Sequence, residues 1–282
     1  MAVATRHPGV ELVLCAQALA RASLVDAFGH VSMRTEAGLL ITPPVPPGSL
    51  TSDAELREVS LDTSELPPGV PLEAWIHVAV LRARPDVGAV CRAQPPVATA
   101  LAAAGAAIWP LHGQGAFCGA EVPVWDDAVL VRDERRATAL AAALGPAPAL
   151  VLRGNGAVTI GSGPGQAVAL MWVLEASARI NRDALAARGA AGKPHERSCA
   201  QVVQMQGSDE QRRERTPVRD RVAQELTPQM RRMGVRDPGG LSGCVPSSRR
   251  PLRDDEQAAW RAAAPELLGR IWSYLREDAK EW

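Results

Sequence analysis

The sequence lacks the features that would indicate a nucleic-acid-binding or membrane protein. Its 31 basic and 31 acidic side chains leave a formal net charge of zero, which argues against a bulk electrostatic role on nucleic acid or on a membrane surface. No apolar run reaches the roughly 18 residues that a membrane span needs, and we expect no export signal at the N-terminus. We therefore expect a cytoplasmic protein with neither nucleic acid nor membrane as a partner.

Cysteine is also scarce. The 282 residues include five cysteines, which are odd in number, scattered along the chain and never arranged as CxxC. A disulfide framework normally shows an even number of cysteines at regular spacings. We expect reduced thiols that mostly fill buried space.

The order of helical and strand patterns predicts one α/β domain followed by an extension. Strand and helix patterns alternate through residues 1–190, which predicts a mixed sheet with helices on its faces. After residue 190 the composition shifts to Gly, Pro and charged residues, and the last 29 residues return to helical spacing. We therefore expect a domain over 1–190 and, over 191–282, a linker and a helical extension. That helix either covers the pocket of its own or a neighbouring subunit, or merely docks on its own subunit.

The most informative stretch runs from residue 71 to residue 96. It predicts an amphipathic helix followed by a short buried strand. Glu73 and His77 are four residues apart and leave the helix on one face. Arg92 and Gln94 are two residues apart at the end of the strand and point to the same side. These four side chains outline a pocket between the helix and the strand end.

Three further segments contribute candidate side chains. His30 and Ser32 alternate along a predicted strand after Gly29, so they share one face. Asn155 lies between two glycines in a tight turn, where it either tolerates a positive φ or contacts a substrate. His112 lies in a glycine-flanked loop and either enters the pocket or stays on the surface.

These motifs, in this order, resemble the class II aldolase/adducin family: Gly-His-x-Ser, Glu-x-x-x-His, the Arg-Pro-Asp-Val link with its strand, and Leu-Arg-Gly-x-Gly. The resemblance implies a three-layer α/β/α fold with a central mixed, mainly antiparallel sheet. It also implies a homotetramer with sites between subunits, and an acid/base role for Glu73. In metal-dependent members the strand ends in His-x-His and a third His follows in the later turn. Here those three positions hold Arg92, Gln94 and Asn155.

This replacement predicts a site without a metal ion. A guanidinium has no free lone pair with which to ligate a metal. Its charge would also repel a divalent ion by about 1–4 kcal/mol per unit charge at about 4 Å, depending on the local dielectric. Gln94 and Asn155 offer weak carbonyl ligands. We therefore expect no metal and no other cofactor, although His30, His77 and Glu73 leave a shifted metal site as an alternative.

The sequence also argues against a sugar phosphate as the substrate. In the phosphate-binding aldolases, serines just before the helix glutamate help to hold the phosphate at the helix N-terminus. Val70, Pro71 and Leu72 take those places here. They offer no hydroxyl, and proline removes one backbone N–H.

We therefore predict a metal-independent enzyme of specialised, natural-product metabolism that acts on a small carboxylate or oxo substrate. Arg92 would stabilise an anionic oxygen, and Glu73 and His30 would move protons in a decarboxylation, dehydration, isomerisation or cyclisation. A structural ion pair between Arg92 and Glu73, and a merely packed His77, are the simpler interpretations. An inactive oligomeric scaffold and a lyase or oxygenase with shifted ligands remain as alternatives. The substrate contacts would come from Ser32, Gln94, Asn155, His77 and His112.

Overall fold

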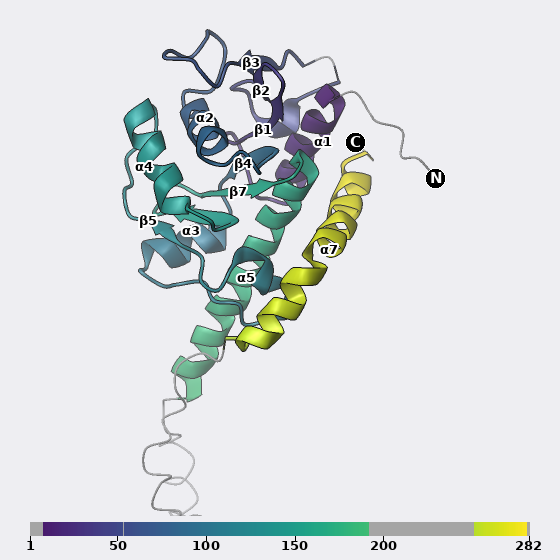
Figure 1. The fold of residues 1–282 in the computed structure, drawn as a ribbon. Coiled ribbons are helices and arrows are strands. Elements are labelled where there is room, and N and C mark those ends of the chain that lie inside the picture. Colours follow the sequence, from purple (N-terminus) through teal and green to yellow (C-terminus); the bar gives the residue numbers. More distant parts are fainter. Residues whose placement is uncertain (1–7, 53, 192–250, 281–282) are drawn as a thin grey trace, which may run out of the picture. The chain divides into compact units, whose positions relative to one another are not determined.

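A computed structural model describes residues 8–52, 54–191 and 251–280 of the chain (Figure 1). The chain divides into two compact units, one made of residues 1–186 and 251–282 and the other of residues 187–250. The first unit contains the sheet and the candidate site. The predicted linker, together with Cys199 and Cys244, lies outside the described residues; the three described cysteines are buried and free.

The centre of the fold is a seven-stranded sheet with the strand order β3-β2-β1-β4-β7-β6-β5. All neighbouring strands are antiparallel except β5 and β6, which are parallel. The sheet is therefore mixed and mainly antiparallel, and the predicted fold class is confirmed. The strands are β1 (His30–Thr35), β2 (Gly38–Ile41), β3 (Arg57–Val59), β4 (Ala89–Ala93), β5 (Val124–Trp125), β6 (Ala149–Leu152) and β7 (Ala157–Gly161).

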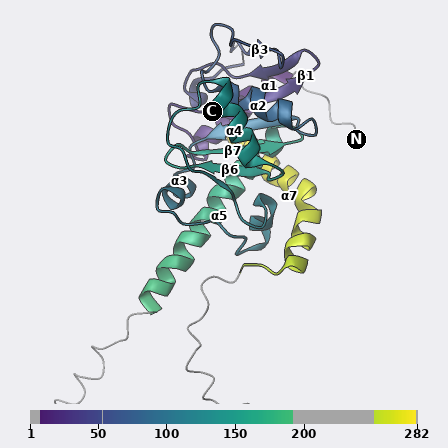
Figure 2. The same cartoon turned by 60° about the vertical axis from the view of Figure 1, so that its left-hand side comes forward.

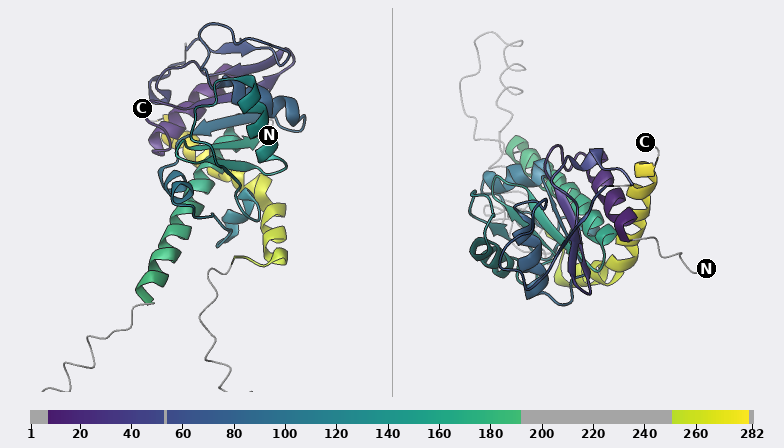
Figure 3. Two further views of the ribbon diagram at one scale, coloured as in Figure 1. Left: turned by 90° about the vertical axis from the view of Figure 1, so that its left-hand side faces the viewer. Right: turned by 90° about the horizontal axis from the view of Figure 1, so that it is seen from above.

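Helices cover both faces of this sheet, as Figures 1 and 3 show. Alternate residues of the central strands bury into different cores, because strand side chains alternate between faces. In β4, Val90 joins the core under α2 and α4, whereas Cys91 joins the core under α1 and α5. The helices are α1 (Pro8–Arg21), α2 (Ala74–Ala83), α3 (Pro96–Ala103), α4 (Glu134–Leu144), α5 (Pro164–Ala191) and α7 (Asp254–Lys280), with the 3-10 turns η1 (Pro47–Ser49) and η2 (Gly113–Cys118).

Helix α7, yellow in Figure 2, packs against α1 and η2 of its own chain. Two of its tryptophans lie over glycines that leave room for their rings. A Cβ atom on Gly113 would come within 1.9 Å of Trp260, and one on Gly165 within 2.4 Å of Trp272. Leu268 of α7 is buried in the core under α1 and α5. No helix in the described part of the chain is both long enough and apolar enough to cross a bilayer.

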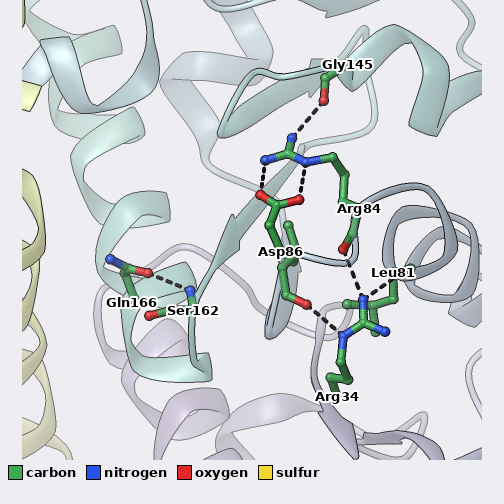
Figure 4. Close-up of polar contacts among 8 residues, drawn as sticks. Arg34, Leu81, Arg84, Asp86, Gly145, Ser162 and Gln166 are labelled. Carbon is green, nitrogen blue, oxygen red and sulfur yellow. Dashed lines mark hydrogen bonds and ion pairs between the residues drawn. The ribbon is translucent and has the colours of Figure 1, made fainter.

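The connection from α2 to β4 is held by Arg34 of β1 (Figure 4). Its Nη2 donates to the carbonyls of Leu81 at 2.7 Å and Arg84 at 3.0 Å, and its Nε donates to the carbonyl of Val87 at 2.9 Å. These are carbonyls at and just beyond the helix end, which have no partner within the helix. Arg34 therefore fixes the angle between α2 and β4, the two elements that carry Glu73 and Arg92.

We expect Arg34→Met to lower the free energy of unfolding by about 2–3 kcal/mol, because three carbonyls lose a charged donor. Chemical denaturation followed by circular dichroism measures this. Arg182→Met is the matched control, since Arg182 pairs with Asp183 at an exposed position, and this variant should leave the free energy of unfolding nearly unchanged. Equal effects of the two variants would show that Arg34 does not hold this connection.

Candidate active site

Three of the predicted site residues form one closed polar cluster. The Nη2 of Arg92 lies 3.0 Å from Oε2 of Glu73 and donates to Oδ1 of Asn155 at 2.7 Å. The amide Nδ2 of Asn155 in turn donates to Oε1 of Glu73 at 3.2 Å. The helix N-terminus, the strand end and the later turn thus meet at one point.

Each member of this cluster is positioned by its local backbone. Glu73 precedes the first residue of α2 but makes no capping hydrogen bond, so its carboxylate is available to Arg92. Asn155 is held close to β4 by the tight turn that contains it. Gly156 has a φ of +82°, and a Cβ atom there would lie 2.1 Å from the carbonyl oxygen of Ala93. Only glycine fits that approach without a backbone shift.

Arg92 is the most unusual residue of the cluster, because its side chain is 1% exposed. Burial lowers the pKa of Arg92, and the carboxylate of Glu73 partly opposes that shift. The Nε and Nη1 atoms of Arg92 are buried and have no partner among the described residues. A buried charged donor without a partner is costly. The guanidinium therefore retains donors that neither Glu73 nor Asn155 satisfies.

A second polar group, three buried side chains linked by two short hydrogen bonds, adjoins the first. The Oγ of Ser32 lies 2.6 Å from Nδ1 of His77, and Nε2 of His77 lies 2.6 Å from Nδ1 of His30. His30 pairs directly with Arg92 across the β1–β4 ladder, so the two side chains share a face of the sheet. The two groups therefore lie side by side beneath α2.

The pKa values of both histidines of this group are lowered, which favours the neutral form of each ring. Burial lowers the pKa of His77 to about 3, with a further contribution from the charge of Arg92. Burial also lowers the pKa of His30 well below its ordinary value, and His77 and Arg92 add to that shift. A proton on either ring would bring a second cation beside a buried guanidinium.

These shifts predict a loss of stability in acid. The unfolded chain takes up protons on both histidines near pH 6.5, whereas folded His77 does so only near pH 3. The free energy of unfolding should therefore fall as pH drops through this window, by up to about 1.4 kcal/mol per pH unit for each histidine. Urea unfolding at about pH 8 and about pH 5, on either side of the ordinary histidine pKa, measures the loss. His77→Gln should reduce it, and an unchanged slope in that variant would contradict the assignment.

A cavity of about 250 Å³ opens beside the two groups. His30, Glu73 and Arg132 supply its charged or titratable side chains, and most of the remaining wall is apolar. Leu72 and Phe28 line it and are 58% and 69% exposed. Arg92 is not part of the cavity wall and lies behind Glu73 and His30. The cavity is suited to a small, partly apolar anion.

The other predicted residues lie elsewhere. Ser32 and His77 are fully buried and do not line the cavity: Ser32 contacts His77, and His77 contacts His30. Gln94 is half-buried just beyond β4, where its backbone N–H donates to the carbonyl of Leu24 at 2.8 Å. His112 is not brought to the cluster: its Nε2 lies 2.9 Å from Oγ of Ser177 on α5, which covers the other face of the sheet.

Among the cavity residues that sequence reasoning missed are Arg132 and Phe28. Arg132 comes from the loop before α4, and nothing in its local pattern separates it from the neighbouring charged residues. Phe28 directly precedes the Gly-His-x-Ser motif. The chain contains two phenylalanines, and one of them next to this motif was a signal that could have indicated an apolar wall of the pocket.

The residues at the family's metal-binding positions do not fit a divalent ion. Arg92 offers no lone pair, and its guanidinium is engaged by Glu73 and Asn155. No group of three or more His, Cys, Asp or Glu side chains suited to a metal ion occurs among the described residues. The side chains at these positions are therefore poor metal ligands, and the positive charge of the site comes from the guanidinium of Arg92.

Comparison with known proteins establishes the class. Residues 10–181 match the model of the class II aldolase and adducin N-terminal domain. The chain therefore belongs to the class II aldolase and adducin family, and the predicted resemblance is confirmed.

Similar proteins indicate the branch of this family. The chain is 35% identical over 192 residues to a 3,4-dihydroxyphthalate decarboxylase of Terrabacter sp. (strain DBF63), which covers 62% of this chain and 80% of that protein. A 3,4-dihydroxyphthalate decarboxylase of Arthrobacter keyseri is 30% identical over 221 residues, with 72% and 89% covered. The crystal structure of L-fuculose-1-phosphate aldolase from Thermus thermophilus superimposes with a TM-score of 0.60 at 32% identity, covering 66% of this chain and 98% of that one.

Proposed function

We propose that this chain is an aldolase-fold carboxy-lyase that acts on a small aromatic carboxylate without a divalent metal ion. The observation that carries the proposal is a buried cluster in which Arg92 and Asn155, at two of the family's three metal-binding positions, contact the carboxylate of Glu73. A fixed guanidinium and a metal ion both stabilise negative charge that develops on a substrate oxygen. Decarboxylation leads the predicted reactions because similar proteins carry the name of decarboxylases.

The cavity supports an aromatic acid as the substrate. Pro71 and Leu72 line it in place of the hydroxyls that would hold a phosphate. Phe28 and Leu72 offer apolar surface for a ring, and Arg132 supplies a cation for a carboxylate. The relatives' substrate, 3,4-dihydroxyphthalate, has these features, so hydroxylated benzene carboxylates are the class to test first.

The chemistry assigns the proton transfer to Glu73. Its carboxylate accepts a proton from a ring hydroxyl and delivers it to the carbon that carries the carboxylate. The bond to that carboxylate then breaks, CO₂ leaves, and the electron pair restores the ring and leaves a phenolate. Arg92 acts from behind Glu73, where it orients the carboxylate and contributes positive charge to the phenolate's field. It is thus a positioning residue in this scheme.

The tetramer, the specialised-metabolism setting and the roles of Gln94 and His112 remain predictions. Assembly into a homo-oligomer would bring a neighbouring subunit to the open side of the cavity, as the family resemblance implies. Sedimentation analysis of the purified chain tests the oligomeric state.

Incubation with a panel of hydroxylated benzene carboxylates, followed by measurement of released CO₂, tests the function. Release that persists in a metal chelator and is lost in Glu73→Gln supports the proposal. Release that the chelator abolishes and an added divalent metal restores would contradict the metal-independent part. No turnover of any acid, with no binding by calorimetry, would favour the non-catalytic scaffold.

A further inference from the structure

The hydrogen-bonded chain of Ser32, His77 and His30 can exist in two directions. In the first, the hydroxyl of Ser32 donates to Nδ1 of His77, Nε2–H of His77 donates to Nδ1 of His30, and His30 carries its proton on Nε2. In the second, every hydrogen bond is reversed and Nε2 of His30 carries no proton. A neutral imidazole has one donor and one acceptor, so the direction is set for the whole chain at once.

The surroundings of Ser32 favour the first direction. Ser32 is fully buried, and within the described residues the one partner of its Oγ is Nδ1 of His77. In the second direction the hydroxyl would accept from His77 and its own hydrogen would have no acceptor. Leaving a buried donor unsatisfied is unfavourable. The serine hydroxyl therefore determines which nitrogen carries the proton at the far end of the chain.

The far end of the chain faces the cavity. His30 lines it and is 6% exposed, and its Nδ1 is already engaged by His77. The other ring nitrogen, Nε2, makes no hydrogen bond to another described residue, and the ring borders the cavity. It is therefore the atom of this chain that a ligand can reach.

We infer that His30 is a neutral hydrogen-bond donor to the anionic oxygen of the substrate, and that Ser32 and His77 are positioning residues that keep the proton on its Nε2. This inference rests on the proposed function. It separates two roles that the sequence left together: Glu73 moves the proton, whereas His30 keeps its own and stabilises charge. A donor held in place in this way needs no reorganisation when the phenolate forms.

The charged groups around His30 are consistent with a neutral ring. Arg92 lies opposite it on β4, His77 and Glu73 approach from α2 and its N-terminus, and Arg132 comes from the loop before α4. Burial and the charge of Arg92 disfavour an imidazolium, and Arg92 and Asn155 already occupy the carboxylate of Glu73. A neutral imidazole that donates can stabilise negative charge without titrating near neutral pH.

Nitrogen-15 NMR of the substrate-free protein, labelled at histidine, tests this inference independently of turnover. His30→Gln and His77→Gln assign the signals. We expect both rings to be neutral at about pH 6, near the ordinary histidine pKa, each with its proton on Nε2. Ser32→Ala should redistribute the His77 proton between its two nitrogens, and Ser32→Thr, which keeps the hydroxyl, should restore the wild-type pattern. A protonated ring, or a His77 proton on Nδ1 in the wild type, would overturn the inference.

The rate of CO₂ release is the second measurement that tests this inference. His30→Ala should slow CO₂ release by about 10²–10³-fold, the usual effect of losing one donor to an oxyanion. Ser32→Ala should slow it less, because a fraction of the molecules keeps the active tautomer, and Ser32→Thr should recover the rate. If the NMR pattern is as expected but no aromatic acid is turned over, the proposed function fails while the fixed tautomer stands. If turnover occurs and Ser32→Ala changes neither tautomer nor rate, the inference fails alone.

Discussion

Arg92→Met is expected to lower the free energy of unfolding by about 3–5 kcal/mol, the usual effect of removing one partner from a buried ion pair. The side chains of Arg92 and Glu73 are 1% and 13% exposed, so the variant leaves a largely buried carboxylate facing a thioether. Asn155 would keep one hydrogen bond to Glu73 but supplies no charge. Denaturant unfolding measures the loss directly.

The double variant Arg92→Met with Glu73→Gln separates the lost charge from lost packing. Replacing both partners of a buried pair is far less costly than removing one. We therefore expect the double variant to be more stable than Arg92→Met alone, and still to release no CO₂. If the two variants were equally unstable, Arg92 would matter through its volume and not through its charge. The comparison remains informative even if Arg92→Met fails to fold.

Glu73→Gln is expected to reduce CO₂ release by about 10²–10⁴-fold, the range for losing a general acid–base group. The amide keeps the shape of the side chain and one acceptor for Arg92, but it cannot carry a proton between a ring hydroxyl and a ring carbon. Steady-state kinetics should show the loss in kcat more than in KM, because the carboxylate acts in the transition state.

Glu134→Gln is the control for this variant. Glu134 makes an ion pair with Arg82, its side chain is 50% exposed, and it does not line the cavity. Its rate should equal that of the wild type. A Glu73→Gln rate within a few-fold of the control would mean that another group moves the proton, and the proposed chemistry would have to be abandoned.

The sequence predicted the fold because its signals were local and mutually consistent. Helical spacing before residue 83 and a β-branched run after residue 86 predicted α2 and β4. The strand runs from Ala89 to Ala93, a boundary that the sequence pattern within residues 71–96 did not fix. Cross-strand pairing decides where a strand ends, and a single segment carries no information about its partner.

Local sequence patterns predicted only part of the candidate site. The sequence placed Glu73 and Arg92 at one pocket, with an ion pair between them as the simpler interpretation, and the structure contains that ion pair at 3.0 Å. The glycines beside Asn155 predicted a tight turn. The hydrogen bond between Ser32 and His77 joins residues 45 apart in the sequence, and the contribution of Arg132 to the cavity depends on where a loop lies. Such long-range contacts follow from the packing of α2 and α4 on the sheet, which no local pattern records.

The most direct test of the account is the metal content of the protein, purified without added metal and measured by mass spectrometry. The matched comparison is a triple variant, Arg92→His with Gln94→His and Asn155→His, which places imidazoles at the three family positions. We predict well below one equivalent of any transition metal in the wild type, and retention of zinc by the triple variant. One equivalent of metal in the wild type, removed by a chelator together with CO₂ release, would contradict the claim that Arg92 stands in for the ion.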